Sequence, residues 1–247
     1  MLGAKPREWD AVYKDVPARF TTAQAENATF NDVVGSFTTG GYSGASGTNI
    51  ALVASTVNGA IVNPGETFSL NGYTGPRGTA QGYVESGIIL DGHADTAVGG
   101  GISQFATTLY NASYFAGMTD VAHTPHSYYI SRYPAGREAT VYEGAIDLQF
   151  KNDSPYPVRI ATSVGGGEVT VSLMGVKTVT VDSINGGRWA ETAPEPMSVP
   201  GSSCVPSSGT PGFTTSDTRV IYDLAGNELS RETRTTVYDP QPIVRCS

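Results

Sequence analysis

Residues 99–117 read GGGISQFATTLYNASYFAG, and this stretch carries the clearest structural pattern in the chain. Its apolar residues recur at the three- and four-residue spacing of one helix face, which predicts an amphipathic helix over residues 102–116. These residues are Ile102, Phe105, Ala106, Leu109, Ala112 and Ala116. Gly117 then ends the pattern, because glycine accepts the left-handed conformation that stops a helix. The helix is preceded by Gly99–Gly101, which allow a tight turn.

The rest of the chain predicts an α+β fold, an antiparallel β-rich domain with two marked helices. The second helix is expected at about residues 48–58, capped by Thr48 or Asn49. Strands are predicted wherever β-branched or aromatic residues lie between Gly, Pro or Asn turns. They are residues 67–70, 87–90, 127–130, 139–142, 147–150, 158–162 and 168–173. A C-terminal β-hairpin is predicted from residues 219–222 and 232–238.

The 247 residues suffice for one large domain or two small ones. We expect residues 1–32 to be an N-terminal arm or the remnant of an upstream region. Residues 33–192 are then the main domain. Residues 193–247 begin with a Pro/Ser/Gly-rich linker and end in the hairpin, which we expect to pack on the main domain.

Composition excludes several classes of protein. The net charge of −8 argues against a nucleic-acid partner, because phosphate binding needs a surplus of cations. No run of about 18 apolar residues predicts a transmembrane segment. The glycine run is neither a dinucleotide fingerprint nor a Walker loop, so no cofactor is expected. Oligomeric state is not determined by the sequence.

Location is indicated by the surface and the cysteines. A charge-poor surface rich in Thr, Ser and Gly predicts an extracytoplasmic protein. Cys204 and Cys246 are the only two cysteines and are expected to form a disulfide; two unpaired thiols are the alternative. Residues 1–6 lack the apolar core of a signal peptide, so a mature or truncated chain without signal or anchor is expected.

Ser103 is the first candidate for chemistry. A helix N-terminus offers free N–H groups and a positive dipole end, which suit an oxyanion or a carboxylate. A serine in that first turn stands where a nucleophile with a built-in oxyanion hole would be placed. The alternative is an ordinary capping serine beside an ordinary glycine turn.

His126, in the run His123-Thr124-Pro125-His126, is the candidate base, because imidazole accepts protons near neutral pH. A solvated or core histidine is the alternative. A zinc set can be assembled by residue type from His93, Asp95, His123 and His126. The short ligand spacings of zinc sites are missing, so no metal is expected.

Several blocks in the right order resemble the VanW domain family over residues 33–175. They are PGETFSLN at 64–71, GPR at 75–77, GY with Glu85 at 82–85, GGGISQ at 99–104, TTLYNA at 107–112, HS at 126–127 and YPAGREAT at 133–140. The C-terminal hairpin is similar to small β-rich wall modules such as G5.

The resemblance implies an envelope protein that acts on or binds peptidoglycan stem peptides, in a family named from vancomycin-resistance clusters. In some relatives it implies an L,D-transpeptidase, in which a cysteine attacks a stem-peptide carbonyl and a histidine serves as base. By position these roles fall on Ser103 and His126. We expect the pocket to be formed by the turn of Gly99, Gly100 and Gly101 and by the polar side chains of Gln104, Arg77, Glu85, Tyr110, Arg132 and His123. Of these, Arg77 or Arg132 would hold a peptide carboxylate.

The chain departs from the family by carrying serine in place of the cysteine. A thiol is already partly ionised near neutral pH, whereas a hydroxyl needs an aligned base at the moment of attack. Three hypotheses follow: a serine acyltransferase or hydrolase, a pseudoenzyme that still binds stem peptide, or a non-catalytic scaffold module.

Overall fold

The computed structural model describes residues 13–14, 16, 18, 20–90, 92–201 and 204–247. The first twelve residues of the predicted N-terminal arm therefore lie outside the described residues. The arm's short helix α1, Thr22–Asn27, is capped by Thr21, whose side chain accepts a hydrogen bond from the backbone of Gln24.

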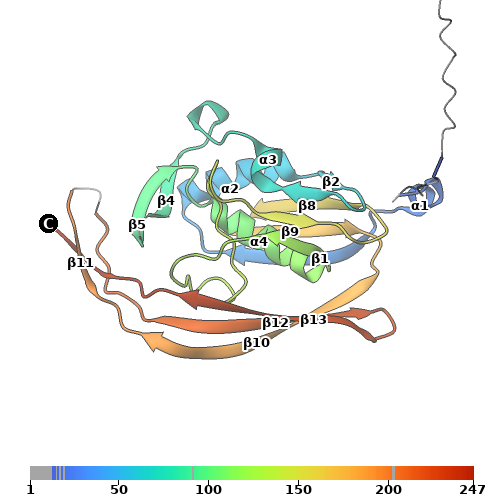
Figure 1. Ribbon diagram of the computed structural model, residues 1–247. Helices are drawn as coiled ribbons and strands as arrows, with labels where there is room; N and C mark the ends of the chain where they lie inside the picture. The colour runs from blue at the N-terminus through green and yellow to red at the C-terminus, as the bar shows by residue number, and fades with distance from the viewer. Residues whose placement is uncertain (1–12, 15, 17, 19, 91, 202–203) are drawn as a thin grey trace, which may run out of the picture.

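The main layer is an antiparallel sheet covered by two helices (Figure 1). Its strands in spatial order are β1 (Asp32–Gly40), β9 (Glu168–Gly175), β8 (Val158–Gly165) and β2 (Ile61–Val62). Helices α2 (Gly44–Val57) and α4 (Ile102–Phe115) pack on this sheet and on each other. At Gly35 of β1 an added Cβ would lie 2.4 Å from the carbonyl oxygen of Ala112. Glycine is therefore required for β1 to lie directly against α4.

The helix predicted over residues 102–116 is confirmed as α4. It ends as expected at Gly117, which has a φ of +76°. The N–H groups of Gly117 and Met118 bond back to the carbonyls of Tyr114 and Ser113. These two bonds form a Schellman motif, in which the last carbonyls of the helix are satisfied.

The second predicted helix exists, but its predicted start at Thr48 or Asn49 is wrong. It begins at Gly44, one turn earlier, and Ser43 caps it by accepting a hydrogen bond from the Ser46 backbone at 3.2 Å. The apolar spacing in the sequence starts only at Ile50, because the additional first turn of the helix packs against its neighbours through small residues. An added Cβ at Gly101 would lie 2.6 Å from the Cβ of Ser46.

Shorter elements surround this layer. A second antiparallel sheet contains β3 (Thr67–Ser69), β7 (Gln149–Lys151) and β6 (Thr119–Ala122). A hairpin is formed by β4 (Glu85–Leu90) and β5 (His93–Val98), linked to the rest by α3 (Leu70–Thr74) and the 3-10 turn η1 (Thr79–Gln81). The predicted strands at 127–130 and 139–142 are irregular, apart from one bridge between Tyr142 and Ile146.

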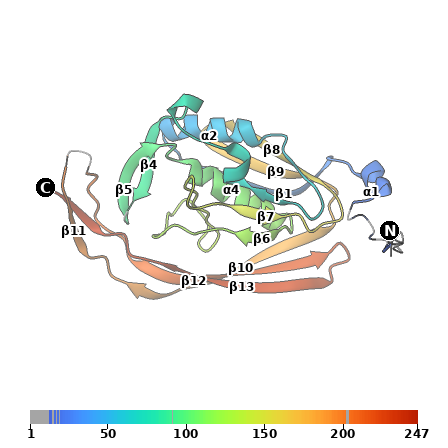
Figure 2. The same ribbon diagram turned by 45° about the horizontal axis from the view of Figure 1, so that its top comes forward.

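The C-terminal part forms a long curved sheet beneath the main layer (Figures 1 and 2). The predicted hairpin is confirmed as β12 (Gly212–Asp223) and β13 (Glu228–Tyr238), and β10 (Val179–Thr192) pairs with β12 as a third strand. β10 belongs to the expected main domain, yet it pairs with the C-terminal hairpin. The domain boundary expected between residues 192 and 193 stays a prediction.

The far end of this sheet is tied by a disulfide. Short strands β11 (Pro196–Val199) and β14 (Ile243–Cys246) pair in parallel, and the expected bond between Cys204 and Cys246 is present. It closes a sequence separation of 42 residues, which restricts the unfolded chain by about 4 kcal/mol in the chain-entropy model. None of the helices in the described part of the chain is long and apolar enough to span a bilayer.

Candidate functional site

The glycine turn before α4 is held tightly in place. Gly99 and Gly101 have φ angles of +82° and +92°, a region that L side chains rarely adopt. At Gly100 an added Cβ would lie 2.1 Å from the carbonyl oxygen of Ser86. Asn49 of α2 fixes the turn from the other side, because its side-chain amide donates to the Gly100 carbonyl at 2.9 Å. All three glycines are therefore needed for the backbone to take this path.

This turn leaves backbone donors open. The N–H of Gly99 bonds to Val84 and that of Gly100 to Ala97. Across the described residues, the N–H groups of Gly101 and Ser103 have no protein acceptor. A left-handed residue followed by a helical one directs successive N–H groups toward one point, an arrangement that binds anions. We call the Gly101–Ser103 segment the amide nest.

Ser103 belongs to a polar stripe on α4, formed with Thr107 and Asn111 at four-residue spacing. Its half-buried hydroxyl oxygen accepts a hydrogen bond from the backbone of Val141 at 3.2 Å. One turn later, the Thr107 hydroxyl contacts the N–H and carbonyl of Ala139 at 3.0 and 3.2 Å.

The last member of the stripe completes the pattern. The side-chain amide of Asn111 donates to the carbonyl of Arg137 at 2.8 Å. Segment 137–141 is thus an extended chain bonded to helix side chains rather than to a strand. This explains why its strand-like sequence forms no ladder.

The other edge of segment 137–141 faces residues 124–126, which include His126. The Thr140 N–H donates to the carbonyl of Thr124 at 2.7 Å. In an extended chain, the backbone N–H and C=O groups of successive residues point to opposite edges. Segment 137–141 therefore lies between α4 and residues 124–126. No hydrogen bond joins Ser103 to a histidine within the described chain, and the catalytic pairing of Ser103 with His126 stays a prediction.

His126 is held by a carboxylate that sequence reasoning did not single out. Its Nδ1 lies 3.0 Å from Oε2 of Glu138, and Glu138 is fully buried. The other oxygen of Glu138 is sealed from solvent and has no hydrogen-bond partner among the described residues. A buried carboxylate on one ring nitrogen fixes the tautomer and orientation of an imidazole. The one signal for Glu138 was its place in the YPAGREAT block.

Arg132 and Gln104 meet at the end of β1. The Gln104 side chain donates to the Gly40 carbonyl at 3.0 Å, and Arg132 donates to the Gly41 carbonyl at 2.9 Å. The Arg132 guanidinium also lies 5.5 Å from the centre of the Tyr133 ring, which stacks on His126 at 5.7 Å. Arg132 therefore connects the end of β1, where Gln104 binds, with the Tyr133–His126 ring pair.

Arg77 and Glu85 have structural partners. Arg77 is buried, and its two terminal nitrogens donate to Asn71 at 2.7 Å and Thr74 at 2.9 Å. Burial lowers the pKa of its guanidinium. Glu85 is exposed on β4 and accepts from the Thr96 hydroxyl at 2.6 Å. Their predicted contact with a substrate stays a prediction.

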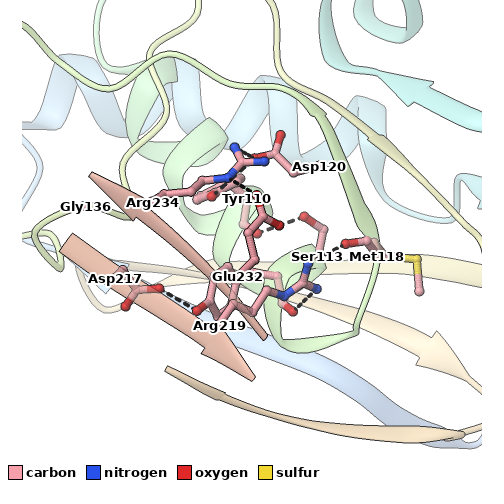
Figure 3. Close-up of a pocket in the computed structure, with 10 residues that line it drawn as sticks. Tyr110, Ser113, Met118, Asp120, Gly136, Asp217, Arg219, Glu232 and Arg234 are labelled. Atoms are coloured by element: carbon pink, nitrogen blue, oxygen red, sulfur yellow. Dashed lines mark hydrogen bonds and ion pairs between the residues drawn. The ribbon is translucent and has the colours of Figure 1, made fainter. Parts of the chain in front are cut away.

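Tyr110 lies in a different place, at the contact between α4 and the C-terminal sheet (Figure 3), and His123 packs on its ring. Their rings stack at 4.3 Å, and His123 Nδ1 lies 2.6 Å from the carboxylate of Asp120. Arg234 of β13 reaches the same carboxylate at 2.5 Å. The cavity there encloses about 20 Å³, enough for about one water molecule. The structure therefore does not bring these two residues together with the nest.

The zinc alternative is not supported by the described residues, because no three His, Cys, Asp or Glu side chains among them come together as a metal set. His93 and Asp95 are on strand β5. His123 and His126 each bond to a different carboxylate.

The fold is an α+β domain in which a glycine turn leaves two backbone N–H groups without a partner, among the described residues, at the start of α4. The VanW-like protein family profile matches residues 45–174, just over half of the chain, and the chain belongs to this family.

The chain is 38% identical over 125 residues to the uncharacterized protein YoaR of Bacillus subtilis, covering 51% of this chain and 41% of the relative. It is 29% identical over 113 residues to the vancomycin B-type resistance protein VanW of Enterococcus faecalis, covering 43% and 40%. The chain thus spans about two fifths of the length of these relatives. No solved structure shows a significant match. The likeness of residues 193–247 to G5 modules stays a prediction.

Proposed function

We propose that this is an extracytoplasmic cell-envelope protein that binds peptidoglycan stem peptides and holds a peptide carboxylate in the amide nest. The observation that carries the proposal is the pair of open N–H groups at Gly101 and Ser103. A vancomycin-resistance protein among the relatives supports the link to the envelope. The disulfide supports an oxidising compartment, where such bonds persist.

The chemistry of the nest suits a carboxylate. The positive end of the α4 dipole and the two N–H groups favour negative charge. The Ser103 oxygen already accepts a hydrogen bond from Val141, so its own proton is available for a ligand oxygen. Arg132 is exposed in the same region and adds a positive charge.

Acyl transfer is the second candidate function, and the buried His126–Glu138 pair favours it. In this reaction the Ser103 oxygen bonds to a peptide carbonyl carbon, and its proton moves to Nε2 of His126. The nest stabilises the oxyanion, and the proton then leaves with the departing amine. Segment 137–141 lies between α4 and residues 124–126, so the reaction requires this segment to shift until His126 is within hydrogen-bond reach of Ser103.

The test is calorimetric titration with disaccharide tetra- and pentapeptides, together with mass spectrometry of the products. We expect Ser103→Ala to weaken binding about tenfold or more, the effect of one hydrogen bond to a charged group. Ser113→Ala is the matched control, because Ser113 is on the same helix and bonds only to the carbonyl of Tyr110.

The outcomes separate the hypotheses. Binding without turnover supports the binding protein. Turnover that Ser103→Ala abolishes establishes acyl transfer by serine. Turnover only in Ser103→Cys identifies a degenerate transpeptidase. Absence of binding by every variant contradicts the proposal.

A further inference from the structure

A second concave site, which no residue of the nest lines, lies at the end of the molecule where the β4–β5 hairpin approaches β11 (Figure 1). This groove has a volume of about 440 Å³, which suits a short peptide segment or a side chain. Residues from the histidine region, β11 and the end of β13 line it. Those used below are Tyr128, Glu195, Pro196, Met197, Asp239 and Pro240.

Tyr128 gives the groove an unused polar group. The residue is only 8% exposed, and its hydroxyl has no hydrogen-bond partner in the described part of the chain. The oxygen is not among the side-chain atoms sealed from solvent. Tyr128 is one of the residues that line the groove. Buried phenols usually find a partner, so an open one indicates a ligand contact.

Two carboxylates face the same groove without a counter-ion. Glu195 and Asp239 are exposed, and neither side chain forms an ion pair or hydrogen bond with another described residue. Both are fixed through their backbones. The Asp239 N–H donates to the Ser127 carbonyl at 2.8 Å, and the Glu195 carbonyl accepts from Ile243 at 2.9 Å. No lysine, arginine or histidine is among the described residues that line the groove.

We propose that this groove binds an aliphatic primary ammonium group carried by a peptide. The two carboxylates complement its charge, and the Tyr128 oxygen accepts a third hydrogen bond. Three acceptors from separate segments match the three donors of an ammonium, whereas a guanidinium requires a planar, two-oxygen partner. Pro196, Met197 and Pro240 give apolar walls for the methylene chain of the ligand. The inference is independent of the function proposed for the nest.

The experiment is a titration of the full chain with the peptide acetyl-Ala-Lys-Ala-amide, followed by two-dimensional NMR of the backbone amides. We expect saturable shifts of amides in the groove, and none at Gly101 and Ser103. Glu195→Gln and Asp239→Asn should each weaken binding about fivefold, as expected for the loss of one ion pair, and Tyr128→Phe about twofold. Glu26→Gln is the control, because this exposed carboxylate is on α1 at the opposite end of the molecule (Figure 1).

Two matched peptides test the chemistry. The same peptide with an acetylated lysine amine should not bind, and the arginine analogue should bind more weakly. Equal binding of the acetylated peptide overturns the ammonium assignment, and tighter binding of the arginine peptide replaces it by guanidinium. Equal weakening by Glu26→Gln, or no shift at any groove amide, overturns the site.

Discussion

The two ends of α4 differ in how their backbone groups are satisfied. At the C-terminal end, the Schellman motif and Arg219 of β12 satisfy the carbonyls of Ser113 and Tyr114. The Arg219 guanidinium donates to Met118 at 2.9 Å and to Tyr114 at 2.5 Å. At the N-terminal end, the N–H groups of Gly101 and Ser103 have no partner among the described residues.

This difference separates structural polar groups from those available to a ligand. Both ends contain charged and aromatic residues, so residue type alone does not distinguish them. At the sealed end, the C-terminal sheet supplies the partners, and they serve to dock the sheet on the helix. At the open end, the glycine turn prevents side chains from covering the amides. The following experiments test the contrast, in order of decreasing expected effect.

The largest effect is expected from Gly100→Ala at the open end. An added Cβ would lie 2.1 Å from the backbone oxygen of Ser86, which cannot move without shifting β4. We expect a loss of about 3 kcal/mol or more in the free energy of unfolding, measured by chemical denaturation. Gly87→Ala is the control, because its Cβ would meet nothing within 4 Å. If both variants were equally stable, the turn would not be under this steric constraint.

At the sealed end, Arg219→Met should cost about 2 kcal/mol in the free energy of unfolding. The substitution removes the hydrogen bonds to the Tyr114 carbonyl of the helix and to the Met118 carbonyl after it, and the contact of the guanidinium with the Tyr114 ring at 4.7 Å. Arg231→Met provides the comparison, because Arg231 forms an exposed ion pair with Glu228 and should change stability little. A wild-type melting curve for Arg219→Met would show that the carbonyls need no such cap.

Alkaline pH should lower the free energy of unfolding through Tyr114 at the sealed end. Burial, and next the hydrogen bond to Asp217, raise the pKa of Tyr114 above its ordinary value of 10.0. Above pH 10 the unfolded chain loses this proton while the folded chain keeps it, so stability falls as the pH rises. We expect Tyr114→Phe to be less stable than wild type at pH 8, and to reduce the proton release on unfolding at pH 11 by up to about one proton. Tyr13→Phe, at an exposed side chain, is the control variant. An unchanged slope in Tyr114→Phe would contradict the assignment.

The smallest effect on stability is expected from Ser103→Ala. It leaves the Val141 N–H without its acceptor, at a cost of about 1 kcal/mol. Hydrogen exchange at the Val141 amide should become faster, whereas Ser113→Ala should leave this exchange rate unchanged. A Val141 amide as protected as in the wild type would mean that the serine does not hold segment 137–141.

Sequence reasoning located the open end of α4 but not all of its neighbours. The apolar spacing and the glycines at 99–101 and 117 are local signals, and both ends of α4 agree with them. Tyr110 was predicted to join Ser103, but seven helical residues span about 10 Å along the axis. This separation places Tyr110 beside Asp120 and the C-terminal sheet instead. Glu138 was not selected, because only tertiary contact reveals that it is buried against His126.

The sequence alone determined the α+β class, the helix behind the glycine turn, the C-terminal hairpin and the cysteine pair, because each depends on spacing or backbone conformation within a short stretch. Only the tertiary structure decided which polar groups stay open. A serine, a tyrosine or a carboxylate has the same local signal whether or not a distant segment supplies its partner. Segment 137–141 engages Ser103, whereas no described residue reaches the Tyr128 hydroxyl. Such partners are brought into contact by chain segments far apart in sequence, and no local pattern records them.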